Sequence, residues 1–177
     1  NPDLLNFTDE TNFTISFWFK TNTSKETHSL LEKRNNGITN KGIHIFLNYG
    51  TMGIQLNDNS YGHDYRGFGN NLADNEWHYL FCTINSDSDL LNIYIDGEKV
   101  GSNISINTVE NFSNEVPWRL GWHVSSAQTY YDGLFNNFIL WTEALTEEEI
   151  QDIFYQEPTG NEDGLAGYYK FNAGSGD

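Results

Sequence analysis

The sequence has little cysteine, proline and positive charge, and it has no long apolar run. Its 177 residues include 1 Cys, 3 Pro and 9 Lys or Arg against 25 Asp or Glu, so the formal net charge is −16. This charge repels a phosphate backbone and excludes nucleic acid as a partner. No apolar run approaches the roughly 20 residues of a membrane-spanning helix, so we expect no membrane insertion.

The lone cysteine restricts the redox chemistry. Cys82 has no partner for an internal disulfide and lies between Phe81 and Thr83 in an apolar segment. No positive neighbour in the sequence activates the thiol, so we expect it to be buried and unreactive. Export without disulfides is typical of bacterial proteins, and the acidic composition suits a soluble one. We therefore expect an extracellular location, either secreted or on the cell surface of a bacterium.

Alternating side chains predict mostly β-strands. Aromatic residues make up 15% of the chain, which favours a β-rich globular protein. Residues 13–20, FTISFWFK, alternate large apolar side chains with the residues between them, a pattern that predicts a half-buried strand. Asp96 and Gly97 follow another apolar strand and predict a two-residue hairpin turn.

One short helix is predicted near the end of the chain. Thr146 and Glu149 have the spacing of a capping box, in which each side chain bonds the backbone amide of the other residue. Ile150, Ile153 and Phe154 then recur on one helical face, which predicts that this face is buried.

Several motifs resemble laminin-G-like domains of the concanavalin A-like lectin/glucanase (jelly-roll) superfamily. They are FTISFWFK at 13–20, DNEWHYLF at 74–81, LNIYIDG at 91–97, and the closing motif at 133–150. The chain differs from the usual closing motif in having Asn136 and Asn137 where relatives have two aspartates. The resemblance implies an all-β fold, a two-sheet antiparallel jelly-roll β-sandwich with one short C-terminal helix.

The predicted domain organisation is one domain with an ambiguous last segment. We expect residues 1–157 to form the laminin-G-like domain and residues 158–164 to form a linker-like loop. Residues 165–177 then form either the final strand of this domain or the start of a following repeat. We favour a tandem parent protein in which this strand still packs on the present domain, and we expect the neighbouring domains of the same chain to be partners.

Two aromatic-rich segments predict the ligand site. Residues 58–71 are expected to form a long loop, and long loops in compact domains are often functional. Aromatic faces and charged groups suit the C–H face and the hydroxyls or carboxylates of a sugar. The candidate ligand-binding residues are Tyr61, His63, Tyr65 and Arg66 in this segment and Trp122, His123, Tyr130 and Tyr131 in the second. The alternative is that these aromatic side chains only pack their loops onto the sheet.

The resemblance also implies a structural calcium ion, because many laminin-G-like domains hold one through loop oxygens. The candidate ligands are Asp9, Asn136, Asn172 and Asp177, and the alternative is that they are turn and cap residues. His78 invites a metal or catalytic role, but it alternates with Trp77 and Tyr79, which we expect to face the core. We expect His78 to be structural.

Three classes of function fit these observations. The first is a noncatalytic carbohydrate-binding or adhesion module that binds a glycan or polysaccharide through aromatic residues on rim loops. The second is a structural spacer or protein-binding domain without a glycan site. The third, an enzyme that cleaves polysaccharides, requires a carboxylate pair, and the acidic motif of the superfamily's glycosidases is missing. We expect the first class, and no enzyme.

Overall fold

The computed structural model describes residues 10–35, 40–58, 60, 62–123 and 130–172. The chain folds into two compact units, each of which contains one antiparallel sheet. As far as they are described, segments 1–20, 77–106 and 134–177 make the first unit, and segments 21–76 and 107–133 make the second.

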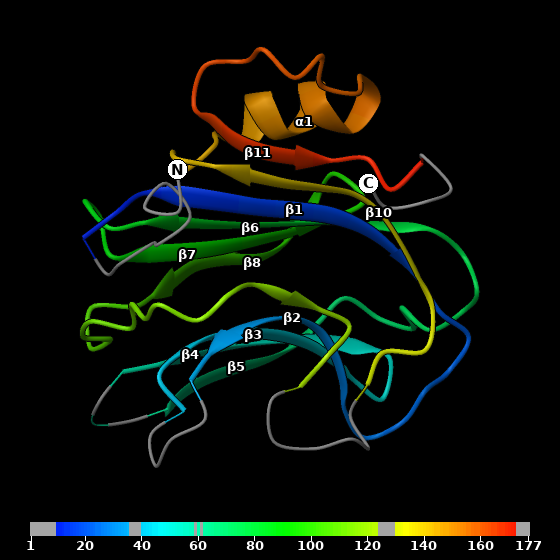
Figure 1. Cartoon of the computed structure of the whole chain (residues 1–177), viewed down its shortest axis with the longest axis horizontal. Helices are drawn as coiled ribbons and strands as arrows, with labels where there is room; N and C mark the ends of the chain where they lie inside the picture. The colour runs from blue at the N-terminus through cyan, green and yellow to red at the C-terminus, as the bar shows by residue number, and fades with distance from the viewer. Residues whose placement is uncertain (1–9, 36–39, 59, 61, 124–129, 173–177) are drawn as a thin grey trace. The chain divides into compact units, whose positions relative to one another are not determined.

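The sheet of the first unit has six strands in the order β11-β10-β1-β6-β7-β8 (Figure 1). These strands are β1 (Phe13–Lys20), β6 (His78–Asn85), β7 (Leu90–Ile95), β8 (Glu98–Ser105), β10 (Leu134–Trp141) and β11 (Leu165–Tyr169). Strand β1 follows the predicted alternation, since Phe13, Ile15, Phe17 and Phe19 are all buried. Cys82 on β6 is buried as expected, and burial raises the pKa of its thiol to about 12, which keeps it protonated.

Helix α1 (Glu147–Tyr155) begins at the predicted capping box. The Glu149 amide donates to Thr146 Oγ1, and the Thr146 amide donates to Glu149 Oε2. Ile150 is buried in a cluster with aromatic residues of the sheet, and Phe154 packs at the edge of that cluster. The cap therefore sets where the helix starts, and the apolar face fixes the helix on the six-stranded sheet.

The predicted hairpin connects β7 and β8. Asp96 and Gly97 both have positive φ angles, 54° and 79°, as a tight two-residue turn requires. The Asp96 carboxylate accepts the Tyr79 amide at 2.8 Å and lies 2.7 Å from His78 Nδ1. His78 thus holds the turn against β6, a contact of the structural kind.

The sheet of the second unit has five strands in the order β5-β4-β3-β2-β9. They are β2 (His28–Arg34), β3 (Gly42–Asn48), β4 (Thr51–Asn57), β5 (Gly62–Phe68) and β9 (Arg119–Leu120). Its two faces differ in chemistry. Ile43, Ile45 and Leu47 of β3 are buried on one face, whereas His44 and Phe46 alternate onto the other. Glu32 on β2 and Gln55 on β4 flank His44 on that second, polar face.

The prediction of a loop for residues 58–71 is wrong at the centre of this segment, because residues 62–68 form strand β5. This strand has polar side chains on both faces and pairs only with β4 at the edge of the sheet. An edge strand with polar residues lacks the apolar period by which strands are recognised in a sequence.

The predicted fold class is confirmed, because the structure has two antiparallel sheets of β-strands and one short helix near the C-terminus. Strand β11 pairs antiparallel with β10, and the proposed boundary at residues 158–164 stays a prediction. The described residues contain no helix of the length and apolarity needed to cross a membrane.

Candidate functional site

A polar hollow of about 320 Å³ lies on the polar face of the five-stranded sheet. Its walls are Thr27, Arg34, Asn40, His44, Phe46, Gln55, Asn57, Arg66 and His123. Strands β2 to β5 each contribute to it, because antiparallel register places His44 between Glu32 and Gln55, and Gln55 opposite Asp64. The hollow is therefore formed by four strands whose same-face positions are aligned.

Arg34 is the centre of the hollow's hydrogen-bond network, although only 4% of its surface is exposed. Its Nη1 donates to Gln55 Oε1 at 2.8 Å, and its Nη2 donates to His123 Nε2 at 2.9 Å. Nη2 also lies 3.4 Å from Glu32 Oε2, a fully buried carboxylate. The buried charge of Glu32 is thus balanced by a guanidinium that is itself fixed by its neighbours.

The cationic groups of the hollow are its arginines rather than its histidines, and each arginine is paired with a carboxylate, Arg34 with Glu32 and Arg66 with Asp64. Burial is the largest cause that lowers the pKa of His44 well below its usual value, and Arg34 adds to it. Burial also lowers the pKa of His123, while Glu32 opposes this shift and Arg34 reinforces it. Both rings are neutral at neutral pH, whereas arginine remains charged even when buried.

Arg66 is the more exposed of the two arginines in the hollow. Its Nη2 lies 2.6 Å from Asp64 Oδ2, and its guanidinium lies 4.9 Å from the centre of the Phe46 ring. These contacts hold the side chain in place while 47% of it stays exposed. Arg66 can therefore present hydrogen-bond donors to a ligand with little further loss of conformational freedom.

Glu32, His44 and His123 also form the described cluster that most resembles a metal site. One ligand atom from each lies within 4.8 Å of the others. Arg34 already donates to His123 and pairs with Glu32, so a guanidinium occupies the position a cation needs. The arrangement does not fit a metal ion.

The structure brings together two of the eight predicted ligand residues in this hollow, Arg66 and His123. Tyr65 alternates away from Arg66 and pairs with Ile54, so it faces the opposite side of the sheet. His63 lies 3.5 Å from Asp58. Tyr61 lies outside the described residues.

The second predicted segment presents exposed aromatic rings. Trp122 is 46% exposed next to His123, and the Arg119 guanidinium lies 5.4 Å from the centre of its ring. Ser29 Oγ donates to the Trp122 carbonyl and also contacts His44 Nε2 at 3.0 Å. Tyr130 is 44% exposed beside the start of β2, and the Tyr131 ring packs near His28.

The calcium candidates are only partly described. Asn136 lies on β10, and its Oδ1 accepts the Asn137 amide at 3.0 Å, which leaves part of its acceptor capacity for a cation. Asn172 is exposed beyond β11, and Asp9 and Asp177 lie outside the described residues. The amide oxygens of Asn136 and Asn172 are of a type that calcium accepts. The calcium site stays a prediction.

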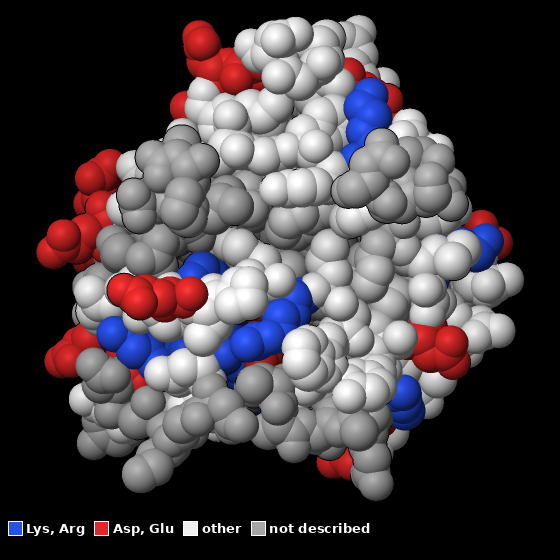
Figure 2. All heavy atoms as spheres, in the orientation of Figure 1, with Lys and Arg blue, Asp and Glu red and all other residues white. Residues whose placement is uncertain are grey.

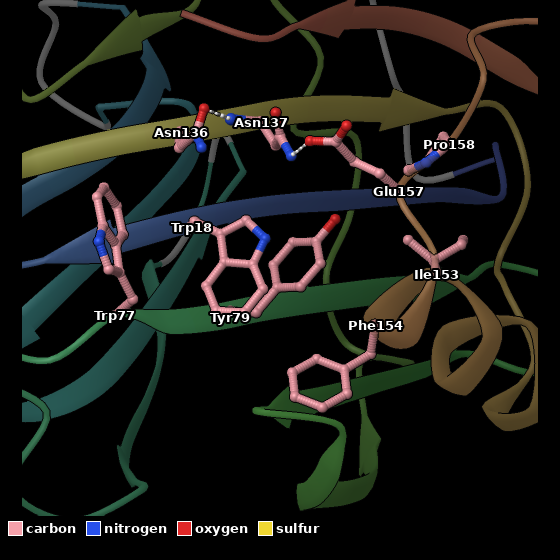
Figure 3. A pocket seen from close by; sticks show the side chains of 9 residues that line it. All are labelled: Trp18, Trp77, Tyr79, Asn136, Asn137, Ile153, Phe154, Glu157 and Pro158. Atoms are coloured by element: carbon pink, nitrogen blue, oxygen red, sulfur yellow. Dashed lines mark hydrogen bonds between the residues drawn. The ribbon is translucent and has the colours of Figure 1, made fainter. Parts of the chain in front are cut away.

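An aromatic groove on the first unit was not predicted from the sequence. Trp77, expected to face the core, is 39% exposed and lines this groove together with Trp18 and Tyr79 (Figure 3). Alternation correctly placed Trp77 and Tyr79 on one side, but Trp77 precedes β6 and escapes burial. The available sequence signal was Trp18, a large aromatic residue on the less apolar side of the first strand.

Known proteins share both sequence and fold with this chain. It is 29% identical over 105 residues to "Non-toxic nonhemagglutinin" of Paraclostridium bifermentans, a match that covers 59% of this chain and 9% of that protein. The chain thus spans about a tenth of the length of this relative.

Two solved structures illustrate the shared fold. A putative carbohydrate binding protein from Bacteroides ovatus matches with a TM-score of 0.71 and 16% identity, over 91% of this chain and 45% of that one. The botulinum neurotoxin serotype D ligand binding domain in complex with N-acetylneuraminic acid matches with a TM-score of 0.64 and 18% identity, over 85% of this chain and 38% of that one. A family profile of laminin-G type covers residues 2–151, and the protein therefore belongs to the concanavalin A-like lectin/glucanases superfamily.

Proposed function

We propose that this domain is a noncatalytic carbohydrate-binding module, and that it binds acidic glycans at the polar hollow of the five-stranded sheet. The observation that carries the proposal is the convergence of Arg34 and Arg66 in one hollow of a chain whose net charge is −16. Figure 2 shows several Lys and Arg side chains close together on the visible face, with Asp or Glu side chains among them. A concentration of donors in an otherwise acidic chain suits an anionic ligand group.

The two arginines supply complementary contacts. Arg66 offers an exposed guanidinium that can take a carboxylate or sulfate through two parallel hydrogen bonds. Arg34 lies at the floor of the polar hollow, and its buried Nε has no hydrogen-bond partner among the described residues. Because buried donors are nearly always paired in proteins, this nitrogen is a candidate contact for a ligand or a water molecule.

Rim residues complete the proposed site. The exposed face of Trp122 suits the C–H side of a pyranose ring, and His123 connects it to the hollow. Tyr130 and Tyr131 remain candidate contacts for sugar units further along a glycan, as do Tyr61, His63 and Tyr65 at the other segment. Trp122 and Arg66 are the residues we expect to matter most.

A binding role is also favoured over catalysis by the partners of the acidic groups. A glycosidase needs two carboxyl groups that act directly on the substrate. Glu32 is buried and paired with Arg34, and Asp64 is paired with Arg66. Two of the similar solved structures are described as a putative carbohydrate binding protein and a ligand binding domain, which supports the same class.

The domain is proposed to work as part of a longer extracellular bacterial protein, with neighbouring domains of the same chain as partners. Its match to only 9% of the Paraclostridium relative supports this view. A spacer or protein-binding role without a glycan site is the competing function, and the same experiment decides between them.

The test is a binding panel of acidic and neutral saccharides with the wild-type domain and two charge variants. Acidic probes are 3′-sialyllactose, oligogalacturonate and heparin-derived oligosaccharides. We expect at least one to bind, and we expect Arg66→Gln to weaken it by about 10- to 100-fold, because a charge-assisted hydrogen bond contributes about 1.5–3 kcal/mol.

Lys99→Gln is the matched control, since it removes one positive charge from the first unit, whereas the hollow is formed by residues of the second. It should leave acidic binding unchanged. A folded protein that binds no acidic probe, or equal losses in both variants, would refute the proposed hollow. If the folded domain binds no neutral saccharide either, the spacer or protein-binding role is favoured.

A further inference from the structure

The first unit contains a groove of about 510 Å³ that the proposed acidic-glycan site does not use. Strands β1, β6 and β10, helix α1 and the segment after it surround the groove (Figure 3). The lining residues are Trp18, Trp77, Tyr79, Asn136, Asn137, Ile153, Phe154, Glu157 and Pro158. Ligand pockets are typically about 300–1,000 Å³, so its size suits a ligand of one or a few sugar rings.

A rigid aromatic platform forms the floor. Trp18 and Tyr79 are cross-strand partners, and their rings stack at 4.5 Å with an interplanar angle of 21°. Phe154 of helix α1 stacks against Trp18 at 6.0 Å. Tyr79 is only 2% exposed and its hydroxyl lies 3.4 Å from Ser16 Oγ, so the platform cannot easily turn.

A second tryptophan, Trp77, lies exposed at one end of the groove. Figure 3 shows Trp77 on one side of the Trp18–Tyr79 pair, with Ile153 and Phe154 on the other. Among the described residues, nothing pairs with the indole N–H of Trp18 or Trp77, and the Trp77 side chain is exposed. The groove therefore offers two aromatic faces and two free donors.

Polar side chains line another edge of the groove. Asn137 Nδ2 donates to Glu157 Oε1 at 2.6 Å, and Asn136 Oδ1 accepts the Asn137 amide, as the dashed lines in Figure 3 show. The hydrogen bond from Asn137 is the largest cause that lowers the pKa of Glu157, so this carboxylate is ionised at neutral pH. It remains 56% exposed and keeps acceptor capacity, while Asn136 Nδ2 has no partner within the described part of the chain.

We propose that this groove is a second binding site, and that its ligand is a neutral pyranoside. The C–H face of a pyranose packs on an indole ring, while its hydroxyls donate to Glu157 and accept from Asn136 and the indole N–H groups. Glu157 is the only charged residue among the nine lining residues, and Lys170, which does not line the groove, pairs with it at 3.3 Å. The lining therefore offers an acidic sugar no cationic group to bind, unlike the polar hollow with its two arginines.

This inference goes beyond the proposed acidic-glycan binding and does not depend on it. The residues that carry it all belong to the first unit, whereas the polar hollow belongs to the second. One site can fail its test while the other passes, since the ligand charge and the variants differ.

The experiment titrates neutral hexasaccharides into the wild-type domain by calorimetry, with cellohexaose, xylohexaose, mannohexaose and laminarihexaose as probes. We expect at least one to bind. Trp77→Ala should weaken this binding by about 10-fold or more, since a stacking aromatic residue is a typical binding hot spot. Asn136→Ala should weaken it less, and Arg66→Gln should leave it unchanged.

Tyr169→Ala is the matched control, because Tyr169 is a 50% exposed aromatic residue of the first unit that does not line the groove. It should bind as the wild type does. Binding that survives both Trp77→Ala and Asn136→Ala would overturn the proposal, as would a folded wild-type domain that binds none of the four probes.

A second measurement, made on the wild-type domain, tests the proposal even if one of the binding variants does not fold. The chain has 5 Trp residues, so the indole N–H signals in an NMR spectrum can be assigned through single Trp→Phe variants. Saturating hexasaccharide should shift the signals of Trp18 and Trp77 in the wild-type domain. If these two signals stay in place while a hexasaccharide binds, the ligand occupies another site and the proposal is wrong.

Discussion

Asn137 donates its side-chain amide to the carboxylate of Glu157 at 2.6 Å, and this pair connects strand β10 to the segment that follows helix α1. Asn137 is only 5% exposed. An aspartate at this position, as laminin-G-like relatives usually have, would place two carboxylates in contact. The asparagine therefore fits the acid across from it.

We predict that Asn137→Asp lowers stability at neutral pH. The change removes a donor and brings two negative charges together, and leaving such a group unsatisfied typically costs about 1–3 kcal/mol. The deficit should shrink as the pH falls below the usual pKa of carboxyl groups, because one of the two then takes up a proton. Urea unfolding at pH 7 and at acidic pH measures both effects.

The double variant Asn137→Asp with Glu157→Gln is the control for this prediction. It restores one donor and one acceptor, so it should recover most of the lost stability at pH 7. If the double variant is as unstable as the single one, the loss comes from packing rather than from charge.

A second prediction concerns pH. His28 is fully buried, and neither of its ring nitrogens has a hydrogen-bond partner among the described residues. Burial is the largest cause that lowers its pKa from 6.5 to about 4, with Lys25 adding to the shift and Asp132 opposing it. The unfolded chain therefore binds the proton first, and stability falls as the pH is lowered from 6.5 toward 4.

The expected loss from this residue is about 2 kcal/mol between pH 7 and pH 5, since each pKa unit corresponds to about 1.4 kcal/mol. Urea unfolding free energies of the wild type and His28→Leu across this range give the test. The variant should show a flatter dependence on pH, although His44, whose pKa is also lowered, retains part of the slope. Parallel curves for the two proteins would show that His28 is not responsible.

A third prediction tests the helix cap. Thr146→Ala removes the oxygen that accepts the Glu149 amide, and the loss of such a cap typically costs about 1 kcal/mol. Thr146→Ser keeps the oxygen and should remain within a few tenths of a kcal/mol of the wild type. Chemical unfolding of both variants measures the difference, and equal losses would mean that the methyl group rather than the cap is what counts.

The helix and the main strands were predictable because their determinants are local. The capping box needs only Thr146 and Glu149, three residues apart, and the alternation from Phe13 to Phe19 lies within one strand. Strand β5 was missed since its pairing with β4, and not its own pattern, makes it a strand.

The candidate sites were harder to predict because they depend on register between distant segments. Arg34 and His123 are 89 residues apart in sequence, and they meet because the sheet and the segment after β9 bring them together. Trp18 and Tyr79 stack because the β1–β6 pairing makes them direct partners. Sequence alone identifies such residues as aromatic or charged, but it does not specify which strand positions face each other.

The last prediction concerns calcium. Asn136 supplies a neutral amide oxygen that already accepts one hydrogen bond, so we expect weak binding, as in extracellular modules with dissociation constants of about 0.1–1 mM. Calcium that binds only the folded protein should raise the free energy of unfolding and, with it, the thermal unfolding midpoint. The gain is about 2.7 kcal/mol when the calcium concentration is a hundred times the dissociation constant. Thermal melts in calcium and in chelator measure this, with magnesium as the control for ionic strength.

The variant Asn136→Ala separates the possible locations of that ion. Loss of the calcium effect in this variant would place the ion at β10, next to the aromatic groove, and calcium would then also strengthen binding of neutral hexasaccharides. A calcium effect that persists in Asn136→Ala would move the site to other oxygen ligands. Identical melts of the wild type in calcium and in chelator would contradict the calcium prediction as a whole, and Asn136 would then be a groove residue alone.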